Sequence, residues 1–382
     1  MQEKLSATFA DSKPHYELLD GLRGVAALIV IWFHIFEAFA TSPLDQKVNH
    51  GYLAVDFFFI LSGFVIGYAY DDRWKTTLTT KNFFRRRLIR LHPMVILGVV
   101  LGTVTYCIQG CVKWDGTHVT ISLLMLAVLF NLFMLPVLPG AGADVRGNNE
   151  MFPLNGPNWS LFFEYIGNIL YALFLRRLRT RTLTALVVFF GICLASFAVL
   201  NLSGYGHLGV GWSLVDHNLA GGLLRMLFSF SAGLLLSRKF KPRPIRGAFW
   251  ICSFSLAILL SLPHMATDSN LWLNGLYDTV CVLIVFPILV YIGAAGRATD
   301  KKTAWLCNFL GDISYPVYVV HYPFAYLFYA WTWSGPHKLT FAQAWPLALT
   351  LFFGSIILAY ACLKIYDEPV RRWLSHKFMS SK

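Results

Sequence analysis

The chain has 382 residues, of which 56% are hydrophobic and 14% are charged, and its formal net charge is +12. Soluble globular domains are about one quarter charged, so this composition excludes a soluble protein and indicates an all-α protein that crosses a membrane several times. The Lys and Arg residues lie in short segments between apolar runs, which is the pattern of membrane topology, so nucleic acid is excluded as a partner.

The chain contains eleven apolar runs that are long enough to span a membrane as helices. In chain order they cover residues 18–40, 52–70, 94–110, 119–139, 158–175, 182–202, 219–237, 247–263, 272–294, 309–330 and 344–365. Four links and the C-terminal end are rich in Lys and Arg and are expected on the cytosolic side. These basic segments are 73–90, 176–181, 238–246, 297–302 and the tail from Arg371. The pattern predicts one membrane domain over 18–366, with cytosolic tails at 1–17 and 367–382.

The alternation of basic and weakly charged links fails only between Arg90 and Arg176, where three apolar runs must make an even number of crossings. We select 119–139 as the run that does not cross, because Pro136 and Pro139 interrupt it and a polar link follows. The rather short run 94–110 is the alternative. The prediction is a polytopic membrane protein of about ten transmembrane helices, with both termini cytosolic and one extra hydrophobic segment that does not cross.

The first predicted span carries two ionisable residues, Arg23 and His34. Their spacing corresponds to about 1100° of helical turn, so both lie on one helix face, about 16 Å apart along the axis. Ionisable groups in hydrocarbon are costly and normally face a protein interior or a water-filled cavity. Taken alone, a headgroup contact of Arg23 and a helix contact of His34 explain the two residues as well as a functional site does.

Two later spans carry polar stripes at helical spacing. The stripes are Ser160, Glu164, Asn168 and Tyr171 in the first, and Ser314, Tyr318 and His321 in the second. Each stripe lies on one helix face and is expected to point into the protein. Counted from the external ends of their spans, His34 and Glu164 are expected at one level of the membrane. Arg225 and Asp278 are also at matching depths and could form a structural ion pair.

Seven stretches of the chain resemble, in order, the acyltransferase-3 family of membrane acyltransferases. They are LDGLRGVAALIVIWFH, VDFFFILSGFVI, FFRRRLIRLHP, NWSLFFE, RMLFSFSAG, ISYPVYVVHYP and YDEPVRRWL, and they cover about residues 18 to 374. The resemblance implies an O-acyltransferase that takes an acyl group from cytosolic acyl-CoA, with acetyl-CoA as the expected donor, and transfers it to a hydroxyl of a saccharide or glycolipid. It implies no permanently bound cofactor and no metal.

The same resemblance implies an integral protein of a bacterial inner membrane, in contact with membrane lipid, that modifies an exported polysaccharide. Some relatives carry a soluble hydrolase-like domain after the last span, and this chain ends about seventeen residues after that span. If such a transferase is needed, it is expected to be a separate extracytoplasmic protein.

Position by position, the resemblance implies catalytic roles for Arg23, His34, Glu164 and His321. His34 suits a general base, because imidazole titrates near neutral pH and a carboxylate can fix its tautomer. Glu164 is the expected carboxylate, and Glu37, three residues after His34, is the local alternative. His34 could instead attack the donor and form an acyl-imidazole. His321 could equally serve helix packing.

The resemblance places the donor-binding motif on Arg86, Arg87 and Arg90. These residues can fall within one helical turn and form a fork for the phosphates of coenzyme A, although topology alone also explains a basic cytosolic link. Arg23 is expected on the donor side, where it could hold a phosphate or the oxyanion, or pair with Asp20. A transporter of a lipid-linked sugar or a proton-coupled substrate is the rival function, but the chain shows no inverted repeat to favour it.

Overall fold

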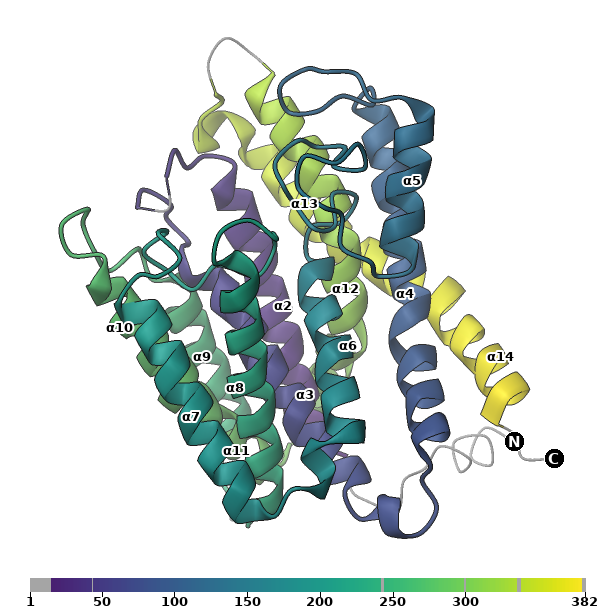
Figure 1. Ribbon diagram of the computed structural model, residues 1–382, viewed down its shortest axis with the longest axis vertical. Coiled ribbons are helices and arrows are strands. Elements are labelled where there is room, and N and C mark those ends of the chain that lie inside the picture. The colour runs from purple at the N-terminus through teal and green to yellow at the C-terminus, as the bar shows by residue number, and fades with distance from the viewer. Residues whose placement is uncertain (1–14, 43, 242–243, 299, 335–337, 380–382) are drawn as a thin grey trace.

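The computed structural model describes residues 15–42, 44–241, 244–298, 300–334 and 338–379, which form a bundle of helices without a β-strand in these ranges (Figure 1). The α-helices are α2 (Glu17–Glu37), α3 (Ala54–Tyr70), α4 (Thr80–Ile108), α5 (Ile121–Leu132), α6 (Asn158–Leu173), α7 (Thr180–Val199), α8 (Asn218–Lys239), α9 (Ala248–Ser261), α10 (Trp272–Val280), α11 (Phe286–Ala295), α12 (Lys301–Trp333), α13 (Phe341–Cys362) and α14 (Glu368–Met379).

Short helical turns connect several of these helices. They are η1 (His50–Leu53), η2 (Arg73–Lys75), η3 (Leu175–Arg177), η4 (Cys281–Val285) and η5 (Leu363–Asp367). The π-helical turns η4 and η5 join α10 to α11 and α13 to α14, so each pair forms one bent rod. Most of the predicted tail 367–382 is therefore helical, and α14 packs against α4. Residues 1–14 of the predicted N-terminal tail lie outside the described residues.

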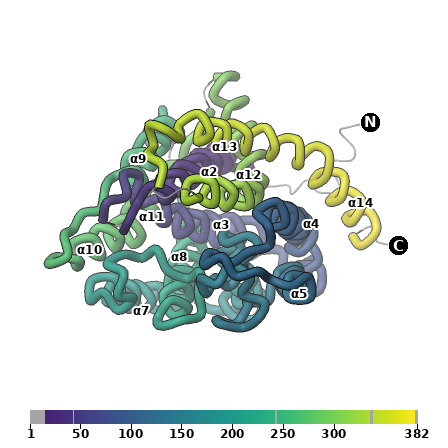
Figure 2. Tube along the Cα trace, turned by 90° about the horizontal axis from the view of Figure 1, so that it is seen from above, coloured from purple at the N-terminus to yellow at the C-terminus, as the bar shows by residue number. Residues whose placement is uncertain are grey.

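The bundle confirms the prediction of a polytopic membrane protein. In the part of the chain that the structure describes, seven helical segments are long and apolar enough to cross a membrane. Three further helices, α6, α9 and α12, run beside them within the bundle (Figures 1 and 2). Figure 2 shows α2, α3 and α12 in the middle of the bundle, where the other helices enclose them.

The segment that the sequence predicts not to cross the membrane forms a short apolar helix. Its helix, α5, has 12 residues and lies beside the upper part of α4 (Figure 1). A left-handed backbone at Met134 and the following Pro136 prevent its continuation. The alternative run, 94–110, is almost wholly inside the 29-residue α4, which is long and apolar enough to cross.

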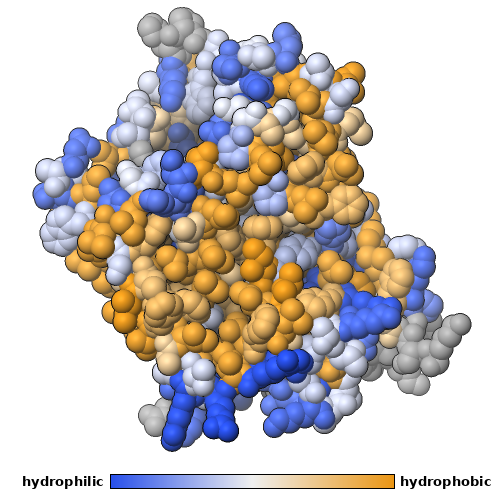
Figure 3. Space-filling model, in the orientation of Figure 1, coloured by the Kyte–Doolittle hydropathy of each residue, from blue (hydrophilic) through white to orange (hydrophobic). Residues whose placement is uncertain are grey.

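Polar residues gather at the two ends of the bundle, and a broad apolar band lies between them (Figure 3). The basic links that follow α3, α6 and α8 all lie at the lower end in Figure 1. The positive-inside rule places such links at the cytosolic face. We call this end the inner end and the opposite one the outer end.

Glycines bring the backbones of α3 and α8 together. A Cβ atom at Gly63 would meet the carbonyl oxygen of Phe230, and one at Gly233 would meet that of Ile60. Small residues at such positions allow close approach of two membrane helices. The close approach places polar groups of α3 directly beside polar groups of α8.

The predicted ion pair between Arg225 and Asp278 is wrong. Arg225 pairs instead with Asp56 of α3, at 2.6 Å between Nη2 and Oδ2, and both side chains are fully buried. Asp278 accepts hydrogen bonds from the Tyr52 hydroxyl at 3.0 Å and the Leu208 backbone N–H at 2.8 Å. Arg225 lies in a buried ion pair, as the sequence predicts. Its partner is on α3, however, because α3 packs closely on α8.

We expect the substitution Asp56→Leu to destabilise the protein by about 3–5 kcal/mol, because it leaves the buried Arg225 charge without its counter-charge. The double substitution Asp56→Leu with Arg225→Met removes both charges and should recover much of that loss. Thermal denaturation of the purified protein in detergent measures both effects. Equal melting temperatures for the wild type and Asp56→Leu would contradict a stabilising role for the pair.

Candidate active site

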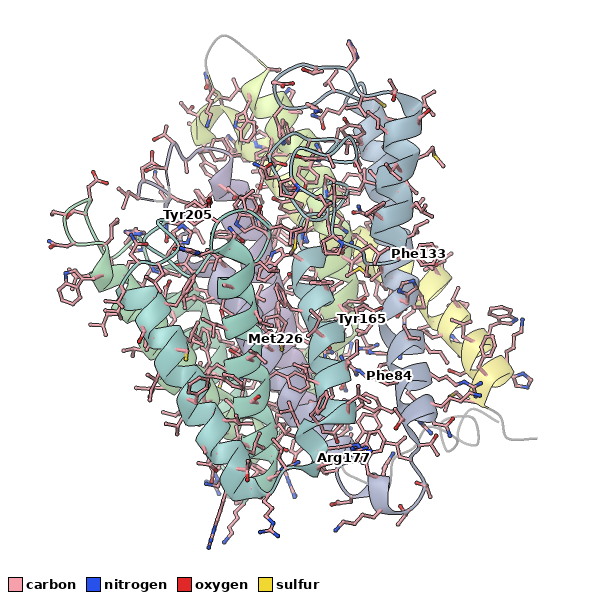
Figure 4. All side chains as sticks on the ribbon, viewed as in Figure 1. Phe84, Phe133, Tyr165, Arg177, Tyr205 and Met226 are labelled. Atoms are coloured by element: carbon pink, nitrogen blue, oxygen red, sulfur yellow. The ribbon has the colours of Figure 1, made fainter. Side chains whose placement is uncertain are left out.

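Two cavities lie one above the other inside the bundle. The outer cavity has a volume of about 460 Å³, and His34, Glu37, Glu150, Trp159 and Tyr322 are among the side chains that line it. The inner cavity has a volume of about 120 Å³, and Arg23, Arg87, Arg90, Glu164 and Ser314 are among its lining residues. In Figure 4, Tyr205, which also lines the outer cavity, lies toward the outer end, whereas Arg177 lies at the inner end.

His34 faces the outer cavity and pairs with Glu37, one helical turn later in α2. The distance between His34 Nδ1 and Glu37 Oε2 is 2.8 Å. The Tyr329 hydroxyl lies 3.0 Å from the same Glu37 oxygen and 2.8 Å from the His34 carbonyl oxygen, so Tyr329 holds the pair from α12. A carboxylate at Nδ1 favours the tautomer whose Nε2 can accept a proton. The local alternative from the sequence is therefore the pair that forms.

The predicted pairing of Glu164 with His34 is wrong. Glu164 lines the inner cavity, where its Oε1 lies 2.7 Å from Arg87 Nη2 and accepts a hydrogen bond from the Ser62 hydroxyl at 2.9 Å. The level of Glu164 had been counted from the external end of its span. The segment before α6 does not lie at the surface, however, because Phe152 and Asn155 are fully buried between helices. α6 therefore begins below the outer end of the bundle (Figure 1), and Glu164 follows the start of this helix by six residues.

Arg23 lies at the inner cavity, on the same face of α2 as His34, as the spacing predicts. Its Nε donates a hydrogen bond to the Ser314 hydroxyl at 2.8 Å, and its Nη2 lies 3.0 Å from Asp20 Oδ1. The pair with Asp20, one of the alternatives from the sequence, therefore forms, and Arg23 also lines a cavity. One helix thus carries a cation to the inner cavity and an imidazole to the outer cavity.

The three arginines of the predicted fork on α4 do not all line the same cavity. Arg87 and Arg90 line the inner cavity together with Arg23, but Arg86 is not among the residues that line either cavity. Residues three apart on a helix are about 60° apart around the axis, whereas neighbours are about 100° apart, so the three side chains cannot share one direction. The inner cavity is lined by the guanidinium groups of Arg23, Arg87 and Arg90. The carboxylates of Glu164 and Asp20 line the same cavity.

His321 lies behind His34 rather than at a cavity wall. Its ring stacks on the His34 ring, with centroids 5.4 Å apart and planes at 30°. Its Nδ1 donates a hydrogen bond to the Val317 carbonyl oxygen at 3.0 Å, while its Nε2 is buried without a partner among the described residues. The His321 ring therefore packs against the His34 ring. The prediction that the polar stripe of α12 points into the protein is confirmed, since Ser314, Tyr318 and His321 are all buried.

Sequence reasoning missed Glu150, which comes from the long segment between α5 and α6. Glu150 is 8% exposed, lines the outer cavity, and accepts hydrogen bonds from the Asn148 amide at 2.9 Å and from the Tyr326 hydroxyl. Burial raises its pKa to about 7. A non-periodic link gives no signal for such a residue, because its environment comes from a tyrosine 176 positions later. Among the described residues, no cluster of His, Cys, Asp and Glu could hold a metal ion.

Residues 16–364 match a family model described as an acyltransferase domain. The acyltransferase MdmB of Streptomyces mycarofaciens is 25% identical over 386 residues, which covers 94% of this chain and 92% of that protein. Protein 2 in the picA locus of Rhizobium radiobacter is 36% identical over 162 residues, which covers 41% of this chain and 80% of that protein.

A third relative, from Staphylococcus aureus strain COL, carries the provisional name of an O-acetyltransferase. It is 39% identical over 97 residues, which covers 24% of this chain and 14% of that protein. No solved structure matches the chain.

We expect Glu150 to make stability depend on pH. Its pKa is raised from 4.5 to about 7 in the folded protein. The folded state therefore binds the proton more tightly, and the stability that this gives is complete below pH 4.5 and lost as the pH rises through 7. Tyr326, Asn148, Arg146 and Glu37 are the polar and charged groups around the carboxyl group.

Thermal denaturation of the wild type and Glu150→Gln across this pH range measures the effect. The melting temperature of the wild type should fall relative to that of Glu150→Gln between pH 4.5 and 7 and then follow it in parallel. Parallel curves over the whole range would contradict the raised pKa, because they require the Glu150 carboxyl group to have the same pKa in the folded and unfolded states.

Proposed function

We propose a specific reaction for this chain, which belongs to the acyltransferase-3 family and is an integral membrane acyltransferase. It transfers an acyl group, expected to be acetyl, from acyl-CoA at the inner end to a hydroxyl of a saccharide or glycolipid in the outer cavity. The observation that carries the proposal is the pair of cavities, one lined by three arginines and the other by His34 with Glu37. A bacterial inner membrane is the proposed location.

Arg23, Arg87 and Arg90 are the proposed donor-binding residues. Guanidinium groups bind phosphate through paired hydrogen bonds and keep their charge when partly buried. The inner cavity, at about 120 Å³, is smaller than the 300–1,000 Å³ that is usual for a whole ligand of this size, so it holds only part of the donor. Arg86 is proposed to contact the nucleotide part at the inner surface. Glu164 positions Arg87.

His34 is the proposed general base. Its Nε2 takes the proton of the acceptor hydroxyl as the oxygen attacks the thioester carbonyl carbon, and Glu37 stabilises the imidazolium through Nδ1. The carbon–sulfur bond then breaks, the ester remains on the acceptor, and the proton passes from His34 to the thiolate of coenzyme A. A route through an acyl-imidazole on His34 uses the same groups in two steps. Arg23, about 16 Å from His34 along α2, acts on the donor and not on the oxyanion.

The outer cavity suits a saccharide. Trp159, Trp212 and Tyr322 offer aromatic faces on which a sugar ring can pack, and Glu150 and Asn148 offer hydrogen-bonding groups to its hydroxyls. A cavity of about 460 Å³ holds one or two sugar rings, within the usual range for small-molecule sites. The aromatic and polar lining therefore supports a polyhydroxylated acceptor over a purely apolar one.

We expect membranes that contain the wild type to incorporate radiolabelled acetyl from acetyl-CoA into saccharide or lipid fractions, and those with His34→Ala to lose this activity. Arg90→Ala should raise the KM for acetyl-CoA, because one phosphate contact is removed. Arg177→Gln is the matched control, since Arg177 is an exposed arginine at the inner end outside both cavities. Retention of full activity in His34→Ala would exclude the proposed base.

Two carboxylate variants separate the proposed roles of Glu37 and Glu164. Glu37→Gln should lower kcat by about 100-fold with little change in the KM for the donor, because it weakens the partner of His34. Glu164→Gln should mainly change the KM for the donor, because it frees Arg87. The same labelled-acetyl assay, with acetyl-CoA varied, measures both. The reverse pattern would return Glu164 to the role of partner to His34.

A further inference from the structure

Tyr318 separates the two cavities. It lines both of them, and Val55 of α3 is the other residue that they share. One turn of α12 toward the inner end, Ser314 belongs to the inner cavity alone, and one turn toward the outer end, Tyr322 belongs to the outer cavity alone. The Tyr318 side chain therefore lies at the level where the inner cavity ends and the outer cavity begins.

A short hydrogen bond joins α12 to α6 at this level. The Tyr318 hydroxyl lies 2.6 Å from the Ser160 hydroxyl of α6, and the carbonyl oxygen of Pro157 accepts a further bond from Ser160 at 3.0 Å. The Phe58 ring of α3 packs edge-on against the Tyr318 ring, with centroids 5.7 Å apart. Tyr318 and Ser160 are 6% and 5% exposed. We call Val55, Phe58, Ser160 and Tyr318 the septum.

The septum lies across the path of the proposed reaction. In the proposed reaction the donor thioester is bound in the inner cavity, whereas His34 lines only the outer cavity. A base that activates an acceptor hydroxyl activates water equally well, so an open path between the cavities would allow His34 to hydrolyse the donor. Acyl transfer to an acceptor therefore needs a barrier that closes when no acceptor is being acylated.

We propose that Tyr318 is this barrier: held by Ser160, it keeps water of the outer cavity away from the donor thioester, and its displacement admits the thioester to His34. The inference rests on the proposed function, because it takes acyl-CoA as the donor. Tyr318 is a gating residue and takes no part in the chemical step. Its hydroxyl and ring have separate tasks, the hydroxyl to hold the closed position and the ring to fill the passage.

Hydrolysis of acetyl-CoA without any acceptor tests the gate, and release of free coenzyme A thiol measures it. The purified wild type should release thiol slowly. Tyr318→Ala, which empties the passage, should release it about 100-fold faster, the lower range of what a positioned general base contributes. Tyr318→Phe keeps the ring and loses the bond to Ser160, so a smaller increase is expected.

Two controls separate gating from a general loss of structure. The double variant Tyr318→Ala with His34→Ala should lose the extra hydrolysis, because water then reaches the thioester without a base. Val317→Ala removes volume from a fully buried neighbour that lines neither cavity and should hydrolyse as slowly as the wild type. If Tyr318→Ala is not recovered in a folded form, Tyr318→Val opens the passage with a smaller loss of packing.

Each outcome has a definite meaning. Rapid hydrolysis by the wild type, or slow hydrolysis by a folded Tyr318→Ala that still binds labelled acetyl-CoA, overturns the gate. Extra hydrolysis that persists without His34 also overturns it, because the water would then come from a distorted site. Failure of the wild type to transfer acetyl to any membrane fraction is a different result, since it contradicts the proposed function itself.

Discussion

Charged side chains inside the apolar bundle require partners, and this requirement determines how the helices pack. An unpaired charge in such surroundings is costly, so each charge must meet a counter-charge or a polar cavity. Among the described residues, three pairs of an arginine with a carboxylate connect segments that are distant in the sequence. These pairs are Arg225 with Asp56, Arg238 with Asp71, and Arg87 with Glu164. The first two join α8 to the two ends of α3, and the third joins α4 to α6, so together they fix the walls around the central helices.

The same requirement explains the place of the candidate site. α2 carries Arg23 and His34 on one face, and that face can be accommodated only beside polar space. Helix α12 contributes a hydrogen-bond partner to each of these residues. Ser314 accepts a hydrogen bond from Arg23, and the Tyr329 hydroxyl donates one to the carbonyl oxygen of His34. Arg23 and His34 are about three turns apart on α2, so each lines its own cavity. The bulky Tyr318 lies between the two cavities.

Helix periodicity and loop charge predicted much of this arrangement from the sequence. They predicted the inward faces of α2, α6 and α12 and singled out the run 119–139, which forms the short helix α5, because these features depend on local spacing and on the parity of basic links. Partners across helices were not predictable in this way. Glu164 was placed beside His34 by counting from the ends of spans, which assumes that helices begin at the membrane surface, and the buried segment before α6 breaks that assumption. Glu150 had no local signal at all.

The central claim is that the donor enters from the inner end while His34 serves the outer cavity. Sealed vesicles of known orientation, made from membranes that contain the protein, test it with labelled acetyl-CoA, which does not cross lipid. Vesicles with the inner end outward should incorporate label without treatment, and vesicles of the opposite orientation should do so only after permeabilisation. Incorporation by intact vesicles whose outer end faces the added donor would contradict the account.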